Sequence, residues 1–167
     1  MFRKHSRAPG ARVPVTDLSA LVRSVAADER LWLPRVELPS GAERWWTRLP
    51  SGPGVDLWLL TWLPGHSTDL HDHGDSAAAF TVVRGRLTEL RQDAQGRLRA
   101  VRRSPGSVTA LAPGVVHDVH GSGREPAVSI HAYSPRLQTM NYYECRRDGQ
   151  LRLRRSVRST EPELESA

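Results

Sequence analysis

The sequence contains little cysteine, little lysine and no long apolar run, and each scarcity excludes a class of protein. Its single cysteine, Cys145, has no partner for an internal disulfide and belongs to no cysteine cluster of the structural zinc type. We therefore expect a reducing, cytoplasmic environment. No run of 18 apolar residues is present, so no membrane span is predicted. The basic N-terminal stretch has no apolar segment behind it, so we expect no secretory signal there.

The positive charge of the chain comes almost entirely from arginine. The sequence has 23 arginines and one lysine, with a formal net charge of +6. A basic excess is one mark of nucleic-acid-binding proteins. Here the arginines are spread along the chain and alternate with apolar residues, as in "LRLRRSVR" over 151–158, which is typical of the solvated face of an edge strand. The aromatic residues do not interleave with them as a stacking platform would. We predict no nucleic-acid partner and keep a basic nucleic-acid-binding barrel as a minor alternative.

One helix is predicted near the start of the chain. Its apolar positions recur at helical spacing, and Thr16 or Asp17 is placed to cap it; these positions are Leu18, Leu21, Val22 and Val25. The segment "DERLWLPRV" over 28–36 predicts a short second turn before Pro34.

After the helix the sequence has the pattern of an all-β protein. About ten short segments are rich in β-forming residues and are bounded by Gly, Pro or Asp-Gly; they include "VDLWLLTWL", "AAFTVV", "RLTELRQ", "AVSIHAY" and "QLRLRRSV". Regularly spaced strands of this kind predict a β-barrel or jelly roll with a short N-terminal helical segment. We expect a single domain over residues 16–158, a disordered basic arm over 1–15 and a disordered acidic tail over 159–167.

Histidines supply the strongest functional signal. His71 and His73 are separated by one residue, so in a strand both imidazoles lie on the same face. His117 follows a Pro-Gly turn in "APGVVHDVHG" and is a third candidate ligand. In a barrel, neighbouring strands can bring inward residues to one point, where three imidazoles would bind a first-row divalent metal and leave coordination positions open. A lone His-x-His pair is more often structural, but the second motif forty residues later strengthens the metal hypothesis.

These motifs resemble those of the cupins, whose first motif continues from His-x-His to a glutamate. That position falls here on Ala77 or Ala78, so the carboxylate ligand is missing. Asp75 has the right parity to replace it, but Gly74 is expected to break the strand, so we expect Asp75 to lie in a loop or to support the ligands from outside. Three neutral imidazoles leave the metal's charge uncompensated, which suits an anionic substrate such as a thiolate.

Within the cupins, the string "HDHGDSAAAFTVVRGRLTE" resembles the metal-binding strand of cysteine dioxygenases. Further segments resemble that family in the same order along residues 44–144: "WWTRLPSG", "TWLPGHSTDLHDH", "PGVVHDVHG" and "EPAVSIHAYSP". The resemblance, which is to the bacterial type, implies a cupin barrel with Fe(II) as cofactor. It implies that the metal ligands are His71, His73 and His117.

The resemblance also implies the reaction, in which both atoms of dioxygen are added to the sulfur of L-cysteine to give cysteine sulfinic acid. Arg48 would bind the substrate carboxylate. Tyr133 would be both catalytic and substrate-binding, and His131 and Ser129 would be catalytic residues that support it from the same face of one strand. L-cysteine and dioxygen are thus the expected partners of a cytoplasmic monomer that binds neither nucleic acid nor membrane.

Two departures from the family bear on this interpretation. Mammalian members carry a cysteine, cross-linked to the active-site tyrosine, at the position of Ala78, so Tyr133 is expected to be unmodified, as in bacterial members. Trp46 stands where many relatives have tyrosine. The alternatives are a 3-mercaptopropionate dioxygenase, against which Arg48 argues because that group has glutamine there, and a non-catalytic cupin that binds a metal or small ligand.

Four further positions carry lesser expectations. His66 and His120 are predicted to lie at the pocket rim or the surface. Ser134-Pro135 is predicted to be a cis peptide, as in relatives. Cys145 is predicted to be a small core residue.

Overall fold

The computed structural model describes residues 12–41 and 43–161, and within them the chain forms one α-helix, two 3₁₀ turns and eleven strands. Most of the arm predicted over 1–15, and most of the tail predicted over 159–167, lie outside the described residues. The helix is α1 (Val15–Ala27), and the turns are η1 (Glu29–Leu31) and η2 (Leu33–Arg35). The strands are β1 (Trp45–Arg48), β2 (Asp56–Trp62), β3 (His71–Asp72), β4 (Ala77–Arg84), β5 (Leu87–Gln92), β6 (Leu98–Arg103), β7 (Val108–Leu111), β8 (His117–Gly121), β9 (Ala127–Ser134), β10 (Thr139–Cys145) and β11 (Leu151–Arg158).

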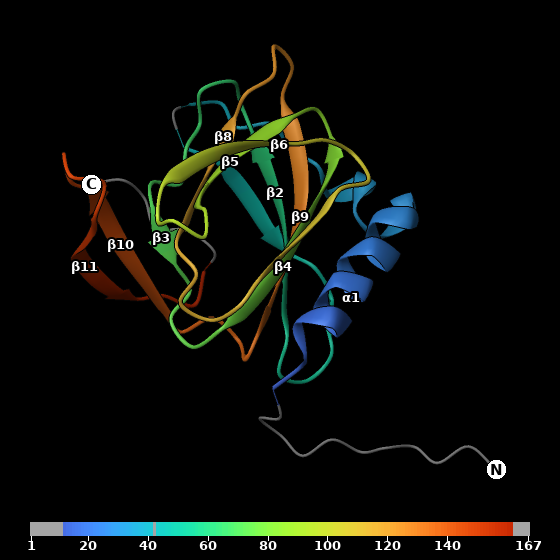
Figure 1. Ribbon diagram of the computed structural model, residues 1–167. Helices are drawn as coiled ribbons and strands as arrows, with labels where there is room; N and C mark the ends of the chain where they lie inside the picture. Colours follow the sequence, from blue (N-terminus) through green and yellow to red (C-terminus); the bar gives the residue numbers. More distant parts are fainter. Residues whose placement is uncertain (1–11, 42, 162–167) are drawn as a thin grey trace.

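Two antiparallel sheets form the body of the molecule (Figure 1). One has five strands in the order β1-β2-β9-β4-β7, and the other has six in the order β11-β10-β3-β8-β5-β6. Non-consecutive strands are therefore neighbours in both sheets, as in a jelly roll. The all-β prediction is confirmed, and each of the ten predicted segments contains a strand. The strand that the sequence did not separate is β3, which has only two residues.

The strand alternation divides the apolar residues between two cores. One face of the five-stranded sheet looks into the barrel, where Trp58, Phe80 and Tyr133 pack against Leu87 and Met140 of the other sheet. The opposite face is covered by α1. In Figure 1 this helix lies on one side of the barrel and the β10–β11 hairpin lies on the other. No helix in the described ranges is long and apolar enough to cross a bilayer.

The helix begins differently from the prediction. Its N-cap is Pro14, and neither Thr16 nor Asp17 provides a side-chain cap. The proline carbonyl accepts hydrogen bonds from the backbone N–H groups of Asp17 and Leu18, each at 3.0 Å. Because the proline ring fixes φ, it suits the entry into a helix without a polar cap. The predicted second turn is present as η1, and η2 continues through Pro34.

The prediction that Cys145 belongs to the core is wrong, because its side chain is exposed. Cys145 is the last residue of β10, next to the turn that leads into β11. Most of β11 is exposed, so this end of the hairpin has little packing against it. The cis form of Ser134-Pro135 is confirmed.

Candidate active site

The three predicted ligand histidines come together inside the barrel. His71 and His117 are directly paired across β3 and β8, and His73 follows β3 immediately. One ring nitrogen from each lies within 4.8 Å of those from the other two, and Nε2 of His71 is 3.1 Å from Nε2 of His73. All three side chains are buried. No other group of His, Cys, Asp or Glu in the described residues has this spacing.

Hydrogen bonds on the far side of two rings fix which nitrogen faces the centre. His71 donates from Nδ1 to the backbone carbonyl of Asp69 at 2.9 Å, and His117 donates from Nδ1 to a carboxylate oxygen of Glu89 at 3.1 Å. Nε2 of His117 is buried and has no hydrogen-bond partner among the described residues. A buried lone pair without a partner is costly in an apolar interior, and a metal ion would satisfy it. The donor set therefore fits a metal.

Two of the buried imidazoles, His71 and His73, are held in the neutral, ligating form. Burial first, and then the charge of neighbouring histidines, lowers the pKa of both His71 and His73 well below the ordinary value. Neutral imidazole is the form that coordinates metals. Gly74, with φ of +57°, ends the strand, and Asp75 beyond it is exposed, so the expectation that Asp75 lies in a loop is confirmed.

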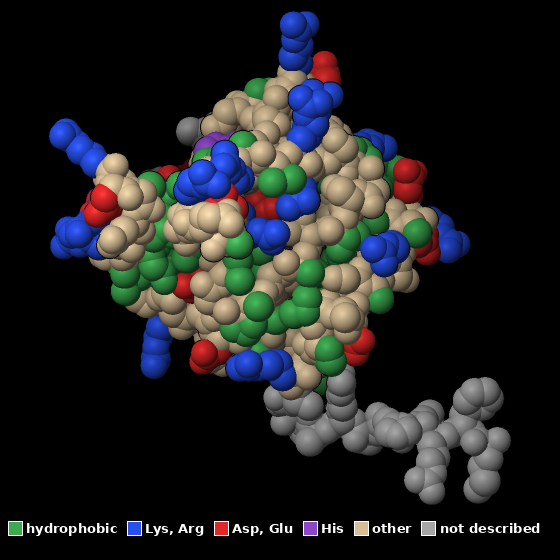
Figure 2. All heavy atoms as spheres, in the orientation of Figure 1, with side chains coloured by type: hydrophobic (Ala, Val, Ile, Leu, Met, Phe, Trp, Pro, Cys, Tyr) green, Lys and Arg blue, Asp and Glu red, His purple; other side chains and the backbone are tan. Residues whose placement is uncertain are grey.

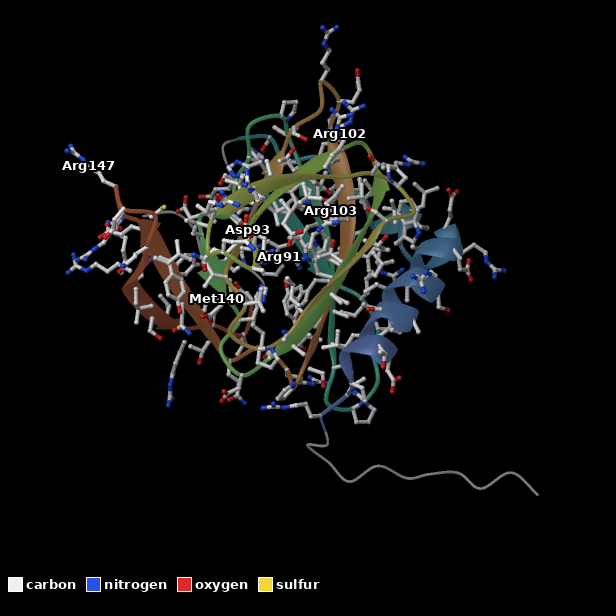
Figure 3. The ribbon with its side chains drawn as sticks, viewed as in Figure 1. Arg91, Asp93, Arg102, Arg103, Met140 and Arg147 are labelled. Atoms are coloured by element: carbon white, nitrogen blue, oxygen red, sulfur yellow. The ribbon has the colours of Figure 1, made fainter. Side chains whose placement is uncertain are left out.

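Glu89 is the functional candidate that sequence reasoning missed. Its carboxylate, with no exposed surface, lies between His117 and Arg103, whose Nε donates to it at 3.0 Å. Arg102 and Arg103 are neighbours on β6 (Figure 3); the first is exposed, whereas the second forms this ion pair. Burial would raise the pKa of Glu89, but bonds and charges from His117 and Arg103 outweigh it and hold the pKa below the ordinary value. Glu89 is thus an ionised partner that orients His117.

Strand β9 carries the three residues that the sequence placed on one face. Ser129, His131 and Tyr133 are all buried, and Oγ of Ser129 is 2.8 Å from Nε2 of His131, whose Nδ1 is 3.5 Å from the Tyr133 hydroxyl. The Trp62 indole N–H, which the sequence did not indicate, donates to Ser129 at 2.8 Å. With Ser129 donating to His131 in turn, the second ring nitrogen of His131 can donate to the phenolic oxygen.

Tyr133 stands between this hydrogen-bonded row and the three histidines. Its ring centroid is 4.8 Å from that of His73. Burial, followed by the charges of His117 and Arg44, lowers the pKa of His131 to about 3. His131 is therefore neutral at physiological pH, with one donor and one acceptor nitrogen. Ala78 is directly paired with Tyr133 on the neighbouring strand and offers it only a methyl group.

Arg48 lies on β1, the edge strand of the five-stranded sheet, on the face that meets the barrel interior. Trp46 shares that face, and both contact Trp58: the ring centroids of Trp46 and Trp58 are 5.1 Å apart, and Cζ of Arg48 is 4.5 Å from the Trp58 centroid. Nη2 of Arg48 donates to the backbone carbonyl of Thr160 at 3.0 Å. As a whole residue Arg48 is exposed.

The other two histidines named from the sequence lie outside the three-histidine cluster. His66 and His120 are partly buried, and His66 accepts a hydrogen bond from the backbone N–H of Leu63. His120 lies 2.8 Å from the carboxylate of Asp118. Neither contributes to the three-histidine cluster.

On the face shown in Figure 2, Lys and Arg side chains are scattered among acidic and apolar ones and form no continuous stripe.

A two-sheet barrel with buried histidines on neighbouring strands defines the cupin class, and solved structures agree. Similar folds are TT1209 from Thermus thermophilus (TM-score 0.53, 17% identity, covering 62% of this chain and 93% of that one) and the cupin domain of Schizosaccharomyces pombe Cnp3 (TM-score 0.52, 13% identity, 62% and 71%). An oxalate oxidase structure matches with a TM-score of 0.53 at 15% identity, covering 66% and 60%. At these identities the likeness concerns the fold alone.

Sequence comparison narrows the class. The family model for cysteine dioxygenase type I matches residues 8–146, so the chain belongs to that family. It is 31% identical over 101 residues to cysteine dioxygenase type 1 of Danio rerio, covering 54% of this chain and 50% of that protein. Against the Homo sapiens protein the identity is 25% over 154 residues, covering 85% and 76%. The match therefore spans about half the length of the fish relative and about three quarters of the human one.

Proposed function

We propose that this protein is a mononuclear non-haem Fe(II) dioxygenase that converts L-cysteine and dioxygen to cysteine sulfinic acid. One observation carries the proposal: three buried histidines converge without a carboxylate among them, and Tyr133 stands directly beside them. The curated relatives are named cysteine dioxygenases, which supports the same reaction.

The histidines would hold the metal through one nitrogen each. Glu89 fixes the tautomer of His117, and the Asp69 carbonyl does the same for His71. Three neutral donors leave the charge of a divalent ion uncompensated, which favours an anionic sulfur over a neutral thiol. Bound Fe(II) would supply the redox chemistry that joins dioxygen to a thiolate.

The chain's own residues position the substrate. Arg48 would bind the carboxylate of cysteine in a charge-assisted pair, which fixes the amino-acid end of the substrate. Tyr133 would donate a hydrogen bond to the reacting oxygens or to the substrate, while His131 and Ser129 keep its hydroxyl in place. The reaction balances without another reductant, because the thiolate and one dioxygen molecule together contain all the atoms of the sulfinate.

Oxygen uptake by the purified protein, loaded anaerobically with Fe(II), tests the proposal. L-cysteine should give one sulfinate per dioxygen consumed, and His71→Ala should abolish both. Running 3-mercaptopropionate in parallel separates the closest alternative, because a 3-mercaptopropionate dioxygenase would turn over that thiol with the higher kcat/KM. A protein that binds Fe(II) but consumes no dioxygen with any small thiol would instead be a non-catalytic cupin.

A further inference from the structure

Trp58 has an unusual hydrogen-bonding state for a buried tryptophan. Three tryptophans are almost completely buried in the described residues: Trp32, Trp58 and Trp62. The indole of Trp32 donates to the Ala26 carbonyl at 3.3 Å, and that of Trp62 donates to Ser129 at 2.8 Å. The indole N–H of Trp58 is buried and has no partner among the described residues. Since tryptophan N–H groups usually find an acceptor when buried, an acceptor is missing from this position.

The strand register places Trp58 between two parts of the candidate site. It is directly paired with Arg48 on β1 and with His131 on β9. Directly paired residues of antiparallel strands share a face, and neighbouring strands lie about 4.8 Å apart. Arg48, Trp58 and His131 therefore form a row across the sheet on its interior face, which begins at the exposed edge and reaches β9 two residues away from Tyr133.

The chemistry of the missing acceptor follows from the neighbours of the indole. The guanidinium of Arg48 stacks on the Trp58 ring, with Cζ 4.5 Å from its centroid. An acceptor that reaches both a guanidinium and an adjacent N–H donor gains most if it is anionic and has more than one oxygen atom. A carboxylate meets this requirement, whereas a thiolate or a hydroxyl offers a single acceptor atom.

We propose that the Trp58 indole N–H is a second donor to the substrate carboxylate, acting beside Arg48 and selecting thiols that carry a carboxylate. This inference deepens the proposed function and rests on it. Arg48 supplies the charge, and Trp58 supplies a directional hydrogen bond from the side of the barrel interior. A thiol without a carboxylate leaves the indole N–H unpaired, so discrimination against it includes the penalty of a buried donor without a partner.

Equilibrium binding of two thiols tests the role of Trp58 without turnover. Dissociation constants of L-cysteine and of cysteamine, which lacks the carboxylate, are measured by calorimetry under argon on Fe(II)-loaded wild type and Trp58→Phe. The variant keeps an aromatic ring under Arg48 and removes the donor together with the five-membered ring that carries it. We expect its dissociation constant for L-cysteine to rise about tenfold and that for cysteamine to change less than about twofold.

Controls separate the role in binding from a structural one. Trp32→Phe removes an indole N–H far from the barrel interior and should leave both dissociation constants unchanged. Trp58→Leu provides a second donor-free variant if Trp58→Phe does not fold. Without thiol, Trp58→Phe should lower the melting temperature no more than Trp32→Phe does, because each leaves a cavity and only Trp32→Phe also loses a protein hydrogen bond.

Three results would overturn the role of Trp58: unchanged binding of L-cysteine, equal weakening of both thiols, or wild-type protein that does not bind L-cysteine. Equal weakening of both thiols, with a melting temperature below that of Trp32→Phe, would assign the N–H to a buried water molecule. Failure of the proposed reaction is seen separately, as an absence of oxygen uptake by wild type.

Discussion

Replacing Glu89 with glutamine probes the support of the metal site most directly. The carboxylate has no exposed surface and contacts His117 on one side and Arg103 on the other. Glutamine keeps the size and removes the charge. Arg103, whose side chain is only 16% exposed, would then lack its ionic partner, and the amide could place either an oxygen or an NH₂ group against Nδ1 of His117. The second arrangement would reverse the tautomer and direct an N–H toward the metal position.

The stability effect follows from the burial of the pair. Removing one partner of a buried ion pair costs about 3 to 5 kcal/mol, and the partial exposure of Arg103 favours the lower figure, about 3 kcal/mol. For a chain of this length that corresponds to a fall in melting temperature of about 10 °C. The loss of an outer partner of a ligating histidine typically weakens metal binding by about 10- to 100-fold.

Two measurements on Glu89→Gln check these figures: thermal unfolding of the metal-free protein and Co(II) affinity by competition with a chelator. Glu144→Gln is the matched control, because Glu144 also contacts two arginines but is 41% exposed. It should melt within about 2 °C of wild type and bind Co(II) equally well. Adding Arg103→Met to Glu89→Gln should recover part of the stability and none of the metal affinity. A Glu89→Gln protein with wild-type Co(II) affinity would refute the assignment of Glu89 as the orienting partner of His117.

Three other substitutions test separate parts of the structure. Arg48→Gln should raise KM for L-cysteine about tenfold or more and leave cysteamine turnover nearly unchanged, and equal kinetics for both thiols would contradict the carboxylate role. Burial, and then the hydrogen bond to Asp72, raises the pKa of Tyr143 to about 12. The neutral phenol therefore contributes its full share to the free energy of unfolding below pH 10, and this share is lost as the pH rises toward 12. Phenolate absorbance should therefore show a late-titrating component that Tyr143→Phe removes; an unchanged titration curve in that variant would be inconsistent with this. In chemical unfolding, Gly85→Ala should lose about 3 kcal/mol more stability than Gly96→Ala. Both glycines have positive φ, but only a Cβ at Gly85 would lie 2.5 Å from a backbone carbonyl oxygen. Equal losses in the two variants would show that the clash at Gly85 is relieved.

The parts of the site that sequence reasoning predicted are those set by local periodicity. Ser129, His131 and Tyr133 alternate within one strand, so period-two geometry alone places them on one face. His71 and His117 come from distant segments, and their meeting required the two cupin-like motifs together. The two-residue strand β3 was not separated, because two residues carry no readable alternation.

The missed residues depend on the register between strands, which local pattern does not contain. Glu89 reaches His117 diagonally, since the paired residues across β5 and β8 are Arg91 with His117 and Glu89 with Val119. One signal was present: Glu89 shares parity with the buried Leu87, and a carboxylate on the apolar face of a strand needs a partner. Trp62 offered no such signal, because a tryptophan at a core position needs no special explanation in a sequence. Its role is seen only in the hydrogen bond that its indole N–H donates to Ser129.

The position of the negative charge explains why losing the cupin glutamate is compatible with a metal site. The carboxylate ligand is absent after His73, because Ala77 and Ala78 occupy the positions of the cupin glutamate. Instead, the carboxylate of Glu89 accepts a hydrogen bond from Nδ1 of His117, the ring nitrogen that faces away from the cluster. Its charge is balanced by Arg103, so the pair raises the donor strength of the imidazole without neutralising a bound cation. On the opposite side, Arg48 adds positive charge at the edge of the barrel. In the proposed reaction the substrate would place one negative group at the histidines and one at Arg48, and an ionised cysteine has that arrangement.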